Sequence, residues 1–411
     1  MNERKRKLLV LSIWEDFWSL GEGSGVPDEL HFIRYLTERG YEIHYLIPEP
    51  EKRSESAGIA DLTFHTYPNI FRMLKPVPGP IRRFLWPAAF TRAVLPRLRE
   101  IAGRIGPDLI LGFTHYSPKP LHIVGGELGI PTAVKLFGVM YLGRFDLPRI
   151  RYKWFNFEQI RALRHPVDHY IVLNDGTQGD KALARLGIPA EKVTFLPNGM
   201  SMEWSDRTVD RNAVRRRMGL PAGDILLVTL ARLVRSKRTT LFLRAASMLG
   251  PEAAGRSAVV IAGEGPERLA LEAEARHLGI AERTFFTGAI PQAEVVDIFK
   301  ACDIFVGTNE LTNMSMPPCE AILCGVPVVA FDVSGTAEVV RNGETGMLVP
   351  EGDVAGLASS IETLITDEAL RRRLGEGAAS FGRRHFVSWD ERIGMELSVL
   401  ERLFGGGSQN R

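Results

Sequence analysis

Apolar and polar positions alternate in blocks along the first half of the chain. Short apolar runs with the length of buried strands lie at Leu8–Ile13, Tyr41–Ile47, Leu109–Gly112, Thr132–Phe137, His169–Leu173 and Val193–Leu196. Stretches with helical spacing separate them, for example Asp28–Glu38, which is followed by Gly40. Continuous apolar strands joined through helices are typical of a parallel sheet covered on both faces. We therefore predict one Rossmann-like domain over residues 1–200.

The same alternation restarts after the charged stretch Ser205–Arg217. Apolar runs recur at Asp224–Leu230, Ala258–Ala262, Thr284–Phe286, Asp303–Val306, Val326–Ala330 and Met347–Val349, with helical spacing over 266–279, 292–301, 316–324 and 353–366. This pattern predicts a second Rossmann-like domain over residues 201–385. Residues 386–404 are expected to form a helix that packs back on the first domain, and 405–411 a disordered tail. The expected fold class is α/β, with two doubly wound parallel-sheet domains facing a central cleft.

Composition indicates the class of protein and its compartment, but not any reaction that it catalyses. The chain has 411 residues, 45% hydrophobic and 24% charged, with a net charge of +2, as expected for a globular protein of two domains. The first apolar run stops at Trp14-Glu15-Asp16, too short for a signal peptide, so we expect a cytoplasmic protein. Three cysteines without metal-ligand spacing predict neither a disulfide framework nor a metal site. The near-zero charge and the absence of a groove-reading motif count against nucleic-acid binding.

A basic segment with interleaved aromatic residues stands out in the first domain. Its eight basic residues are Arg72, Lys75, Arg82, Arg83, Arg92, Arg97, Arg99 and Arg104, and its one acid is Glu100. Apolar residues such as Phe84, Trp86 and Phe90 lie between them. This mixture suits an anionic membrane surface or an anionic acceptor. The alternative is a solvated amphipathic helix whose aromatic residues belong to the core.

Two cations follow the first strand of the second domain, at the edge where such sheets bind ligands. Arg232 comes directly after the strand that ends at Leu230, and Lys237 lies five residues further, at the start of a helix. Such a pair can neutralise a departing pyrophosphate, aided by the partial positive charge of the helix N-terminus. Two ordinary surface cations are the alternative that spacing alone leaves open.

Glycine-rich turns are the next candidate feature. Gly263 and Gly265 lie between a strand and a helix and permit a close backbone approach, but the third glycine of the dinucleotide fingerprint is absent. That absence counts against a nicotinamide enzyme. Gly23, Ser24 and Gly25, after the first strand of the chain, are candidates for binding a phosphate or the acceptor through backbone amides. A plain turn is the alternative.

The order of motifs resembles that of the retaining glycosyltransferases of family four, which have the two-domain GT-B fold. The matching landmarks are Leu196-Pro197-Asn198-Gly199, Ala231-Arg232-Leu233 with Lys237, Gly263-Glu264-Gly265-Pro266, Phe286-Thr287-Gly288, Ala301-Cys302-Asp303-Ile304-Phe305-Val306, and Glu320-Ala321 followed by Gly325-Val326-Pro327-Val328-Val329-Ala330. The resemblance is good over about residues 195–385, and in the first domain it is limited to architecture and a few positions. It implies that the C-terminal domain binds the donor nucleotide and the N-terminal domain binds the acceptor.

The resemblance also assigns roles to individual residues. Arg232 and Lys237 match the residues that bind the donor phosphates. Glu320 matches the second glutamate of the family's Glu-x7-Glu motif, which holds the ribose hydroxyls. Taken alone, Glu320 is a carboxylate at the start of a helix, where the helix dipole stabilises it without any ligand.

Three more donor positions and one histidine follow from the same resemblance. Backbone groups near Gly288 and Ala289 are expected to recognise the base, and Met316 is expected to belong to the donor site. His115 resembles the family's histidine beside the donor sugar, where it would hydrogen-bond the sugar or polarise the site. A satisfied surface histidine is the alternative.

The sequence departs from the family at three places, of which the least weighty is Met200-Ser201 after Asn198-Gly199, where the family commonly has an aspartate. Thr312 stands where the motif has its first glutamate, Asn313 follows where glycine is usual, and Glu310 lies two residues too early. In the family that first acid contacts hydroxyls of the transferred sugar, so Thr312 or Asn313 would have to supply neutral hydrogen bonds instead. The later His-Gly of the family is Phe137-Gly138 here.

The resemblance implies a retaining transferase that moves a sugar from a nucleotide-diphosphate donor to a glycan, lipid-linked or small-molecule acceptor. No evident pair of carboxylates supports a double displacement, so same-face displacement is favoured. No cofactor or metal is expected. Alternatives are a nucleotide-sugar epimerase of the same fold and a nucleotide-sugar-binding relative without activity. If the basic segment binds lipid, the protein is expected at the inner face of the membrane.

Overall fold

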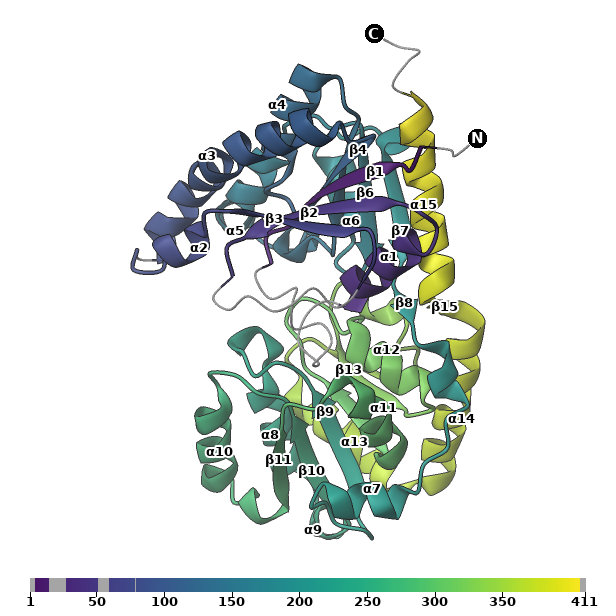
Figure 1. The fold of residues 1–411 in the computed structure, drawn as a ribbon. Coiled ribbons are helices and arrows are strands. Elements are labelled where there is room, and N and C mark those ends of the chain that lie inside the picture. The colour runs from purple at the N-terminus through teal and green to yellow at the C-terminus, as the bar shows by residue number, and fades with distance from the viewer. Residues whose placement is uncertain (1–3, 15–26, 51–58, 78, 407–411) are drawn as a thin grey trace. The chain divides into compact units, whose positions relative to one another are not determined.

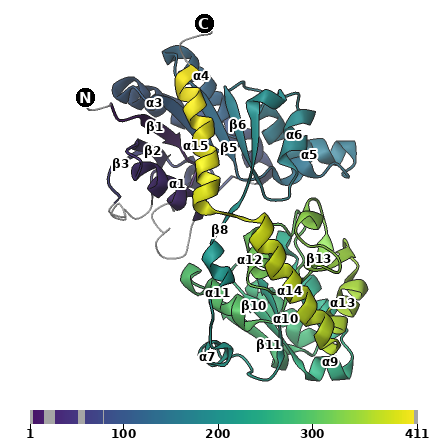
Figure 2. The same ribbon diagram turned by 90° about the vertical axis from the view of Figure 1, so that its right-hand side faces the viewer.

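The computed structural model describes residues 4–14, 27–50, 59–77 and 79–406, which fall into two compact units. Unit 1 consists of the chain up to Asn174, Gln178–Gly199 and the segment from Trp389 onward. Unit 2 consists of Asp175–Thr177 and Met200–Ser388. Each unit contains one large parallel sheet with helices around it (Figures 1 and 2).

Unit 1 is built on a sheet of seven parallel strands in the order β3-β2-β1-β4-β5-β6-β7. The strands are β1 (Lys7–Leu11), β2 (Glu42–Pro48), β3 (Leu62–Tyr67), β4 (Leu109–Phe113), β5 (Thr132–Leu136), β6 (His169–Asn174) and β7 (Val193–Pro197). The helices are α1 (Pro27–Thr37), α2 (Ile70–Met73), α3 (Gly79–Ile105), α4 (Pro118–Leu128), α5 (Arg149–Ala162), α6 (Gly179–Arg185) and α15 (Trp389–Gly406), with 3-10 turns η2 (Met140–Gly143) and η3 (Ala190–Lys192). The strand order reverses direction between β1 and β4.

Unit 2 has a sheet of six parallel strands in the order β11-β10-β9-β12-β13-β14. The strands are β9 (Ile225–Leu230), β10 (Ser257–Ala262), β11 (Thr284–Gly288), β12 (Ile304–Gly307), β13 (Val328–Asp332) and β14 (Gly346–Pro350). The helices are α7 (Arg211–Arg217), α8 (Thr239–Ser247), α9 (Pro251–Gly255), α10 (Arg268–His277), α11 (Gln292–Ala301), α12 (Met316–Leu323), α13 (Val354–Thr366) and α14 (Glu368–His385), with 3-10 turns η4 (Met202–Ser205), η5 (Arg235–Lys237), η6 (Ala281–Arg283) and η7 (Thr336–Glu338). The order reverses between β9 and β12, and β8 (Gly199–Met200) with β15 (Val387–Ser388) forms a separate two-stranded sheet.

Both faces of each large sheet are buried, which explains the continuous apolar runs in the sequence. In β1, Leu9 and Leu11 belong to one apolar cluster, whereas Leu8 and Val10 belong to the cluster on the opposite face. All four side chains are fully buried. The predicted fold class, two doubly wound parallel-sheet domains, is confirmed by the two sheets.

Several elements differ from the sequence-based expectation, among them the short strands β8 and β15 and the short helices α7 and α9. The edge strand β3 was not among the predicted strands, because its run Leu-Thr-Phe-His-Thr-Tyr is half exposed and half polar. The 18-residue helix α14 was also not predicted. Helix α15 continues to Gly406, two residues into the segment expected to be a tail, and residues 407–411 lie outside the described part of the chain.

Helix α15 is tied to unit 1 by a group of buried charges. Lys135 at the end of β5 lies 2.5 Å from Asp28 Oδ1 and 2.8 Å from Glu396 Oε2. Arg392 of α15 pairs with the same two carboxylates. Lys135, Arg392 and Glu396 have no exposed surface. Burial lowers the pKa of Lys135, and the carboxylate of Glu396 acts in the opposite direction. The charges of this cluster therefore hold one another within the core.

We expect Lys135→Met to lower the free energy of unfolding by about 3–5 kcal/mol, because it leaves Asp28 and Glu396 buried beside Arg392 alone. Urea unfolding followed by circular dichroism measures the change. The control is Lys5→Met, since Lys5 forms an exposed pair with Asp61 at 2.7 Å and should contribute at most about 1 kcal/mol. Equal effects of the two substitutions would show that the buried cluster does not stabilise unit 1.

Candidate functional site

Loops that follow neighbouring strands are joined by hydrogen bonds at the carboxyl edge of the unit 2 sheet. The amide of Gly263, after β10, donates to the carbonyl of Gly288, at the end of β11, over 2.8 Å. The Thr308 hydroxyl, after β12, donates to the carbonyl of Lys237 over 2.9 Å. Because the strand order reverses between β9 and β12, this edge is where doubly wound sheets bind ligands. The structure brings the predicted donor-site loops together here.

The two glycines of the loop after β10 are required by the protein's own backbone. Gly263 has φ +133°, and a Cβ atom there would lie 1.9 Å from the carbonyl oxygen of Ala231. A Cβ atom on Gly265 would lie 2.3 Å from the carbonyl oxygen of Leu233. The close approach predicted for these glycines is therefore made to the loop after β9. That loop carries Arg232, so the glycines determine where this cation lies.

Gly288 and Ala289 occupy the end of β11 and the residue after it. Gly288 has φ +77°, a conformation that favours glycine. Its carbonyl is engaged by Gly263 within the fold. Ala289 is exposed, so of the two positions it is the one open to solvent.

Arg232 and Lys237 lie in the loop between β9 and α8. Arg232 is exposed, and Lys237 is partly buried at the end of η5. Burial lowers the pKa of Lys237, and the neighbouring charge of Arg232 lowers it further. An anion such as a diphosphate would relieve this repulsion between two cations. The spacing Arg-x4-Lys thus places the two charges close enough to repel each other.

Asp175 is a charged residue of this site that the sequence patterns did not single out. Residues 175–177 pack with unit 2, although they directly follow β6 of unit 1. The Asp175 carboxylate accepts hydrogen bonds from the Thr177 amide at 3.0 Å and hydroxyl at 2.5 Å. Burial raises the pKa of Asp175 to about 6, and the charge of Lys237 acts in the opposite direction. The signal in the sequence is a polar run, Asn-Asp-Gly-Thr, directly after a buried strand.

Glu320 lies within α12, which corrects its expected place at the start of a helix. The helix begins at Met316, so the carboxylate is in the second turn and the helix dipole does not explain it. Its side chain is buried, with 5% of the residue exposed. Burial raises the pKa of Glu320 to about 7, and a hydrogen bond with the Gln292 side chain opposes the shift. A buried carboxyl group with so high a pKa is a candidate binding group rather than a helix-stabilising charge.

Asn313, one of the two residues expected to supply a neutral hydrogen bond to the sugar, uses both ends of its amide within the fold. Asn313 has no exposed surface. Its Oδ1 accepts from the Asn309 amide at 3.1 Å, and its Nδ2 donates to the Phe331 carbonyl at 3.0 Å. Thr312 is also buried, and its hydroxyl accepts from the Met314 amide at 3.0 Å. Of the two, Thr312 retains a hydroxyl proton to donate.

Glu310 and Met316, on either side of this segment, have contacts of their own. Glu310 lies 3.5 Å from Arg238, whose other nitrogen is 2.7 Å from Glu351. Glu310 is thus paired with Arg238, the residue that precedes α8. Met316 is partly buried and packs against the apolar cluster of unit 2.

His115 lies in unit 1, in the loop after β4, at the point where the strand order reverses. Burial lowers the pKa of His115 to about 4, so the imidazole is neutral near pH 7. The residue before it, Thr114, has φ +77°, which is strained for a β-branched side chain. The buried hydroxyl of Thr114 has no hydrogen-bond partner among the described residues. Strain and an unpaired polar group beside His115 mark this loop as a binding candidate.

Three further features of unit 1 were singled out in the sequence: the first glycine-rich turn, Phe137 and the basic segment. Gly23, Ser24 and Gly25 lie outside the described residues. Phe137, at the place of the family's His-Gly, packs edge-on against Phe113 with ring centroids 5.4 Å apart. The basic segment forms α2 and α3, and Arg83, Arg97 and Arg99 are neutralised by Glu158, Glu100 and Glu127, respectively.

Residues 4–14, 27–50, 59–77 and 79–406 contain neither a cluster of metal ligands nor a helix that could span a membrane. No group of three His, Cys, Asp or Glu side chains in these ranges is arranged to hold a metal ion. In the same ranges, no helix has both the length and the apolar character that a membrane crossing needs. The three cysteines are buried free thiols.

Comparison with known proteins supports this reading of the fold. The chain resembles the D-inositol 3-phosphate glycosyltransferase of Streptomyces bingchenggensis, with 29% identity over 57% of this chain and 53% of that protein. The chain thus spans about half the length of such relatives. The N-acetyl-alpha-D-glucosaminyl L-malate synthase of Bacillus anthracis is 24% identical over 88% of both chains.

Solved structures give the same fold at low sequence identity. Sucrose-phosphate synthase from Thermosynechococcus elongatus has a TM-score of 0.78 and 18% identity, covering 97% of this chain and 99% of that one. Anabaena HepE in complex with UDP and glucose has a TM-score of 0.71 and 18% identity, again covering 97% and 99%.

Two family profiles divide the chain between them. The profile described as Glycosyltransferase Family 4 matches residues 30–204, and the profile described as Glycosyl transferases group 1 matches residues 210–381. The strand order of both sheets and these two matches agree with the resemblance seen in the sequence. The chain belongs to the family-four glycosyltransferases, with the GT-B fold.

Proposed function

We propose that this protein is a retaining glycosyltransferase that transfers a sugar from a nucleotide-diphosphate donor to a hydroxyl group of its acceptor. The observation that carries the proposal is the arrangement of Arg232, Lys237 and Glu320 in unit 2. Two cations lie after β9, beside the reversal of strand order, and a buried carboxyl group lies in the helix after β12. A diphosphate and a ribose need these two kinds of group.

Same-face displacement is the proposed mechanism. The bond between the anomeric carbon and the donor phosphate oxygen breaks, and the acceptor oxygen forms the new bond on the same face of the sugar. The acceptor proton passes to the leaving phosphate oxygen. Arg232 and Lys237 stabilise the negative charge that develops on that phosphate. His115, neutral near pH 7, would serve as a hydrogen-bond partner of the donor sugar rather than as an acid.

Uridine diphosphate is the proposed nucleotide part of the donor, because the similar HepE structures contain UDP, UDP with glucose, and UDP-glucose. The acceptor is proposed to be a glycan, a lipid-linked compound or a small hydroxylated molecule. Relatives named for D-inositol 3-phosphate and L-malate support an anionic acceptor among these. We further propose that catalysis needs no metal and that the protein acts in the cytoplasm, at an anionic membrane surface.

The first test is a thermal-shift comparison of uridine, guanosine, adenosine and thymidine diphosphates without added metal and with magnesium. UDP at about 100 times its dissociation constant should stabilise the folded state by about 2.7 kcal/mol. Product analysis with UDP-sugars and candidate acceptors then separates the functions. Transfer supports the proposal, isomerisation of the donor would show an epimerase, and binding without turnover would show an inactive relative.

Lys237→Ala should weaken UDP binding by roughly 10- to 100-fold, because it removes a charge-assisted contact with the diphosphate. The matched control is Arg235→Ala, since Arg235 is an exposed cation in the same 3-10 turn. Titration calorimetry at constant ionic strength measures both variants. The assignment of Lys237 to the diphosphate fails if the two variants bind UDP equally well.

Glu320 should make both stability and UDP binding depend on pH. Its pKa of about 7 in the folded protein exceeds the ordinary value of 4.5, so between these values the folded state holds a proton that the unfolded state has lost. Stability should therefore fall by up to about 1.4 kcal/mol per pH unit as pH rises through this window. UDP should bind more weakly below pH 7, where the carboxylate that accepts ribose hydroxyls becomes protonated.

Glu320→Gln should remove the fall in stability between pH 6 and 7 and weaken the pH dependence of UDP binding, whereas Asp175, with a pKa of about 6, still contributes below pH 6. Glu282→Gln, at an exposed glutamate of the same unit, should leave both dependences unchanged. Urea unfolding and UDP titration across pH 5–8 measure the two effects. A wild-type-like slope in Glu320→Gln would assign the titration to another group.

Asp175→Asn should move the alkaline limit of activity to lower pH. The Asp175 carboxylate favours the charged form of Lys237, whose pKa is already lowered by burial and by Arg232. Without that carboxylate, Lys237 loses its proton at lower pH and the leaving diphosphate is less well neutralised. The pH dependence of kcat/KM shows the shift, with Asp180→Asn, at an exposed position nearby, as the control. An unchanged alkaline limit would leave Asp175 with a purely structural role.

A further inference from the structure

Exposed apolar side chains of unit 1 concentrate on two neighbouring helices. Among the described residues, five of the twelve exposed large apolar side chains lie on α3 and α5, namely Ile81, Phe84, Leu85, Ile150 and Trp154. Phe84 is 57% exposed and Trp154 53% exposed. Large exposed aromatic groups on one face of a protein indicate a surface that contacts another protein or a membrane.

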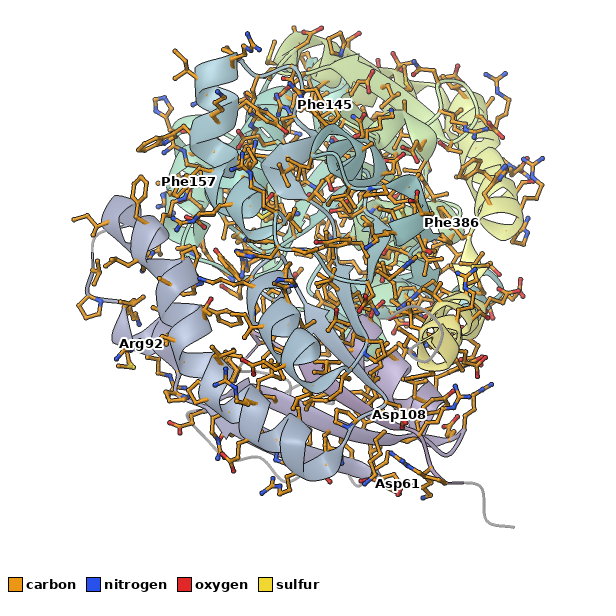
Figure 3. The ribbon with its side chains drawn as sticks, turned by 90° about the horizontal axis from the view of Figure 1, so that it is seen from above. Asp61, Arg92, Asp108, Phe145, Phe157 and Phe386 are labelled. Carbon is orange, nitrogen blue, oxygen red and sulfur yellow. The ribbon has the colours of Figure 1, made fainter. Side chains whose placement is uncertain are left out.

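The two helices present these aromatic groups together. The Phe84 ring of α3 stacks on Phe157 of α5 at 4.6 Å and meets Trp154 edge-on at 6.4 Å. Arg83 lies over the Phe157 ring and donates to the Phe155 carbonyl at 2.8 Å. Figure 3 labels Phe157 and Arg92, which belong to these two helices. The aromatic surface is therefore held by contacts between α3 and α5.

A small basic pocket opens beside this aromatic surface. It has a volume of about 220 Å³, and its lining includes Phe84, Tyr116, Lys119, Arg161 and His165. Among the residues that the structure describes, no acidic side chain lines it. The volume is below the ~300–1,000 Å³ typical of sites for drug-sized ligands, so the pocket suits a head group.

The basic groups of the pocket repel one another. Burial lowers the pKa of His165, and the nearby charges of Lys119, His122 and Arg161 lower it further. Within residues 4–14, 27–50, 59–77 and 79–406, no carboxylate forms an ion pair with Lys119 or Arg161. Glu158, an acid of α5, is already bonded to Arg83 and Tyr116. An anion in the pocket would therefore compensate charges that the protein leaves unbalanced.

We propose that this pocket binds the phosphate of an anionic phospholipid at a bilayer surface, while Phe84 and Trp154 enter the interfacial region beside it. Charge complementarity favours a phosphate, and the aromatic border favours a phosphate that is attached to a bilayer. Aromatic rings and basic side chains on one face are the usual composition of a surface that lies on a membrane.

This inference rests on the proposed function and extends it. The surface would bring the transferase to a bilayer that carries a lipid-linked acceptor. The pocket lies in unit 1, whereas the proposed nucleotide site lies in unit 2. Tyr116, which lines the pocket, directly follows His115, and their ring centroids are 4.1 Å apart. A docked lipid would therefore lie beside the loop that carries the proposed sugar-contacting histidine.

The test is sedimentation of the full chain with two kinds of vesicle, pure phosphatidylcholine and an equal mixture of phosphatidylcholine and phosphatidylglycerol. The wild-type protein should sediment with the mixed vesicles only, and less so as salt is raised. Lys119→Ala/Arg161→Ala should bind the mixed vesicles roughly 25-fold more weakly, because each lost basic group should weaken binding by about fivefold and the two factors multiply. Phe84→Ser/Trp154→Ser should also reduce binding.

The matched control is Arg216→Ala/Arg276→Ala, which removes two exposed arginines from unit 2 and should bind like the wild type. Lys119→Gln/Arg161→Gln, with thermal unfolding of every variant, separates loss of binding from loss of folding. Wild-type protein that stays in the supernatant with both vesicles would overturn the proposal. So would equal binding by the pocket variant and the control variant.

Inorganic phosphate distinguishes a bilayer lipid from a soluble phosphate. If phosphate raises the melting temperature of the wild type but not of Lys119→Ala/Arg161→Ala, and no vesicle is bound, the pocket serves a soluble compound and the membrane proposal is wrong. UDP stabilisation of the same variants reports separately on the nucleotide site. Wild-type protein that UDP stabilises but that binds neither vesicle would reject this inference alone. Wild-type protein that binds the mixed vesicles but is not stabilised by UDP or another nucleotide would reject the proposed function alone.

Discussion

All strands within each large sheet run parallel, and this constraint decides where the protein keeps its charged groups. A parallel strand is buried on both faces, so ionised side chains lie at or next to the strand ends and in the loops beyond them. The carboxyl ends of neighbouring strands meet at one edge of a sheet. Arg232, Lys237 and the backbone of Gly263 and Gly288 come together for this reason, although they are spread over more than fifty residues of sequence.

The sequence predicts the strands that are buried on both faces, because each of them is a continuous run of apolar residues. Twelve of the thirteen strands of the two large sheets coincide with predicted apolar runs. The exception, β3, lies at the edge of its sheet, where half-exposed positions accept threonine and histidine. Arg232, Lys237 and Gly263 could be found from their spacing after strands, because strand ends mark the ligand-binding edge.

Residues that depend on contacts across the fold could not be found in this way. The burial of Glu320 depends on how α12 packs, and the use of the Asn313 amide depends on Asn309 and Phe331. Asp175 follows a strand of unit 1 yet packs with unit 2, so no local pattern relates it to Lys237. The buried cluster around Lys135 joins positions 28, 135 and 396, and no periodicity connects such distant charges.

Helix α15 also limits how this protein can exchange parts with its relatives. Unit 1 takes Arg392 and Glu396 from the end of the chain, after the whole of unit 2 has been synthesised. A hybrid that joins residues 1–199 to the second half of another glycosyltransferase would lack Arg392 and Glu396, the charges with which α15 completes the cluster of Lys135 and Asp28. Unit 2 is therefore an insertion within unit 1, and recombination that preserves folding must cut the gene on both sides of it.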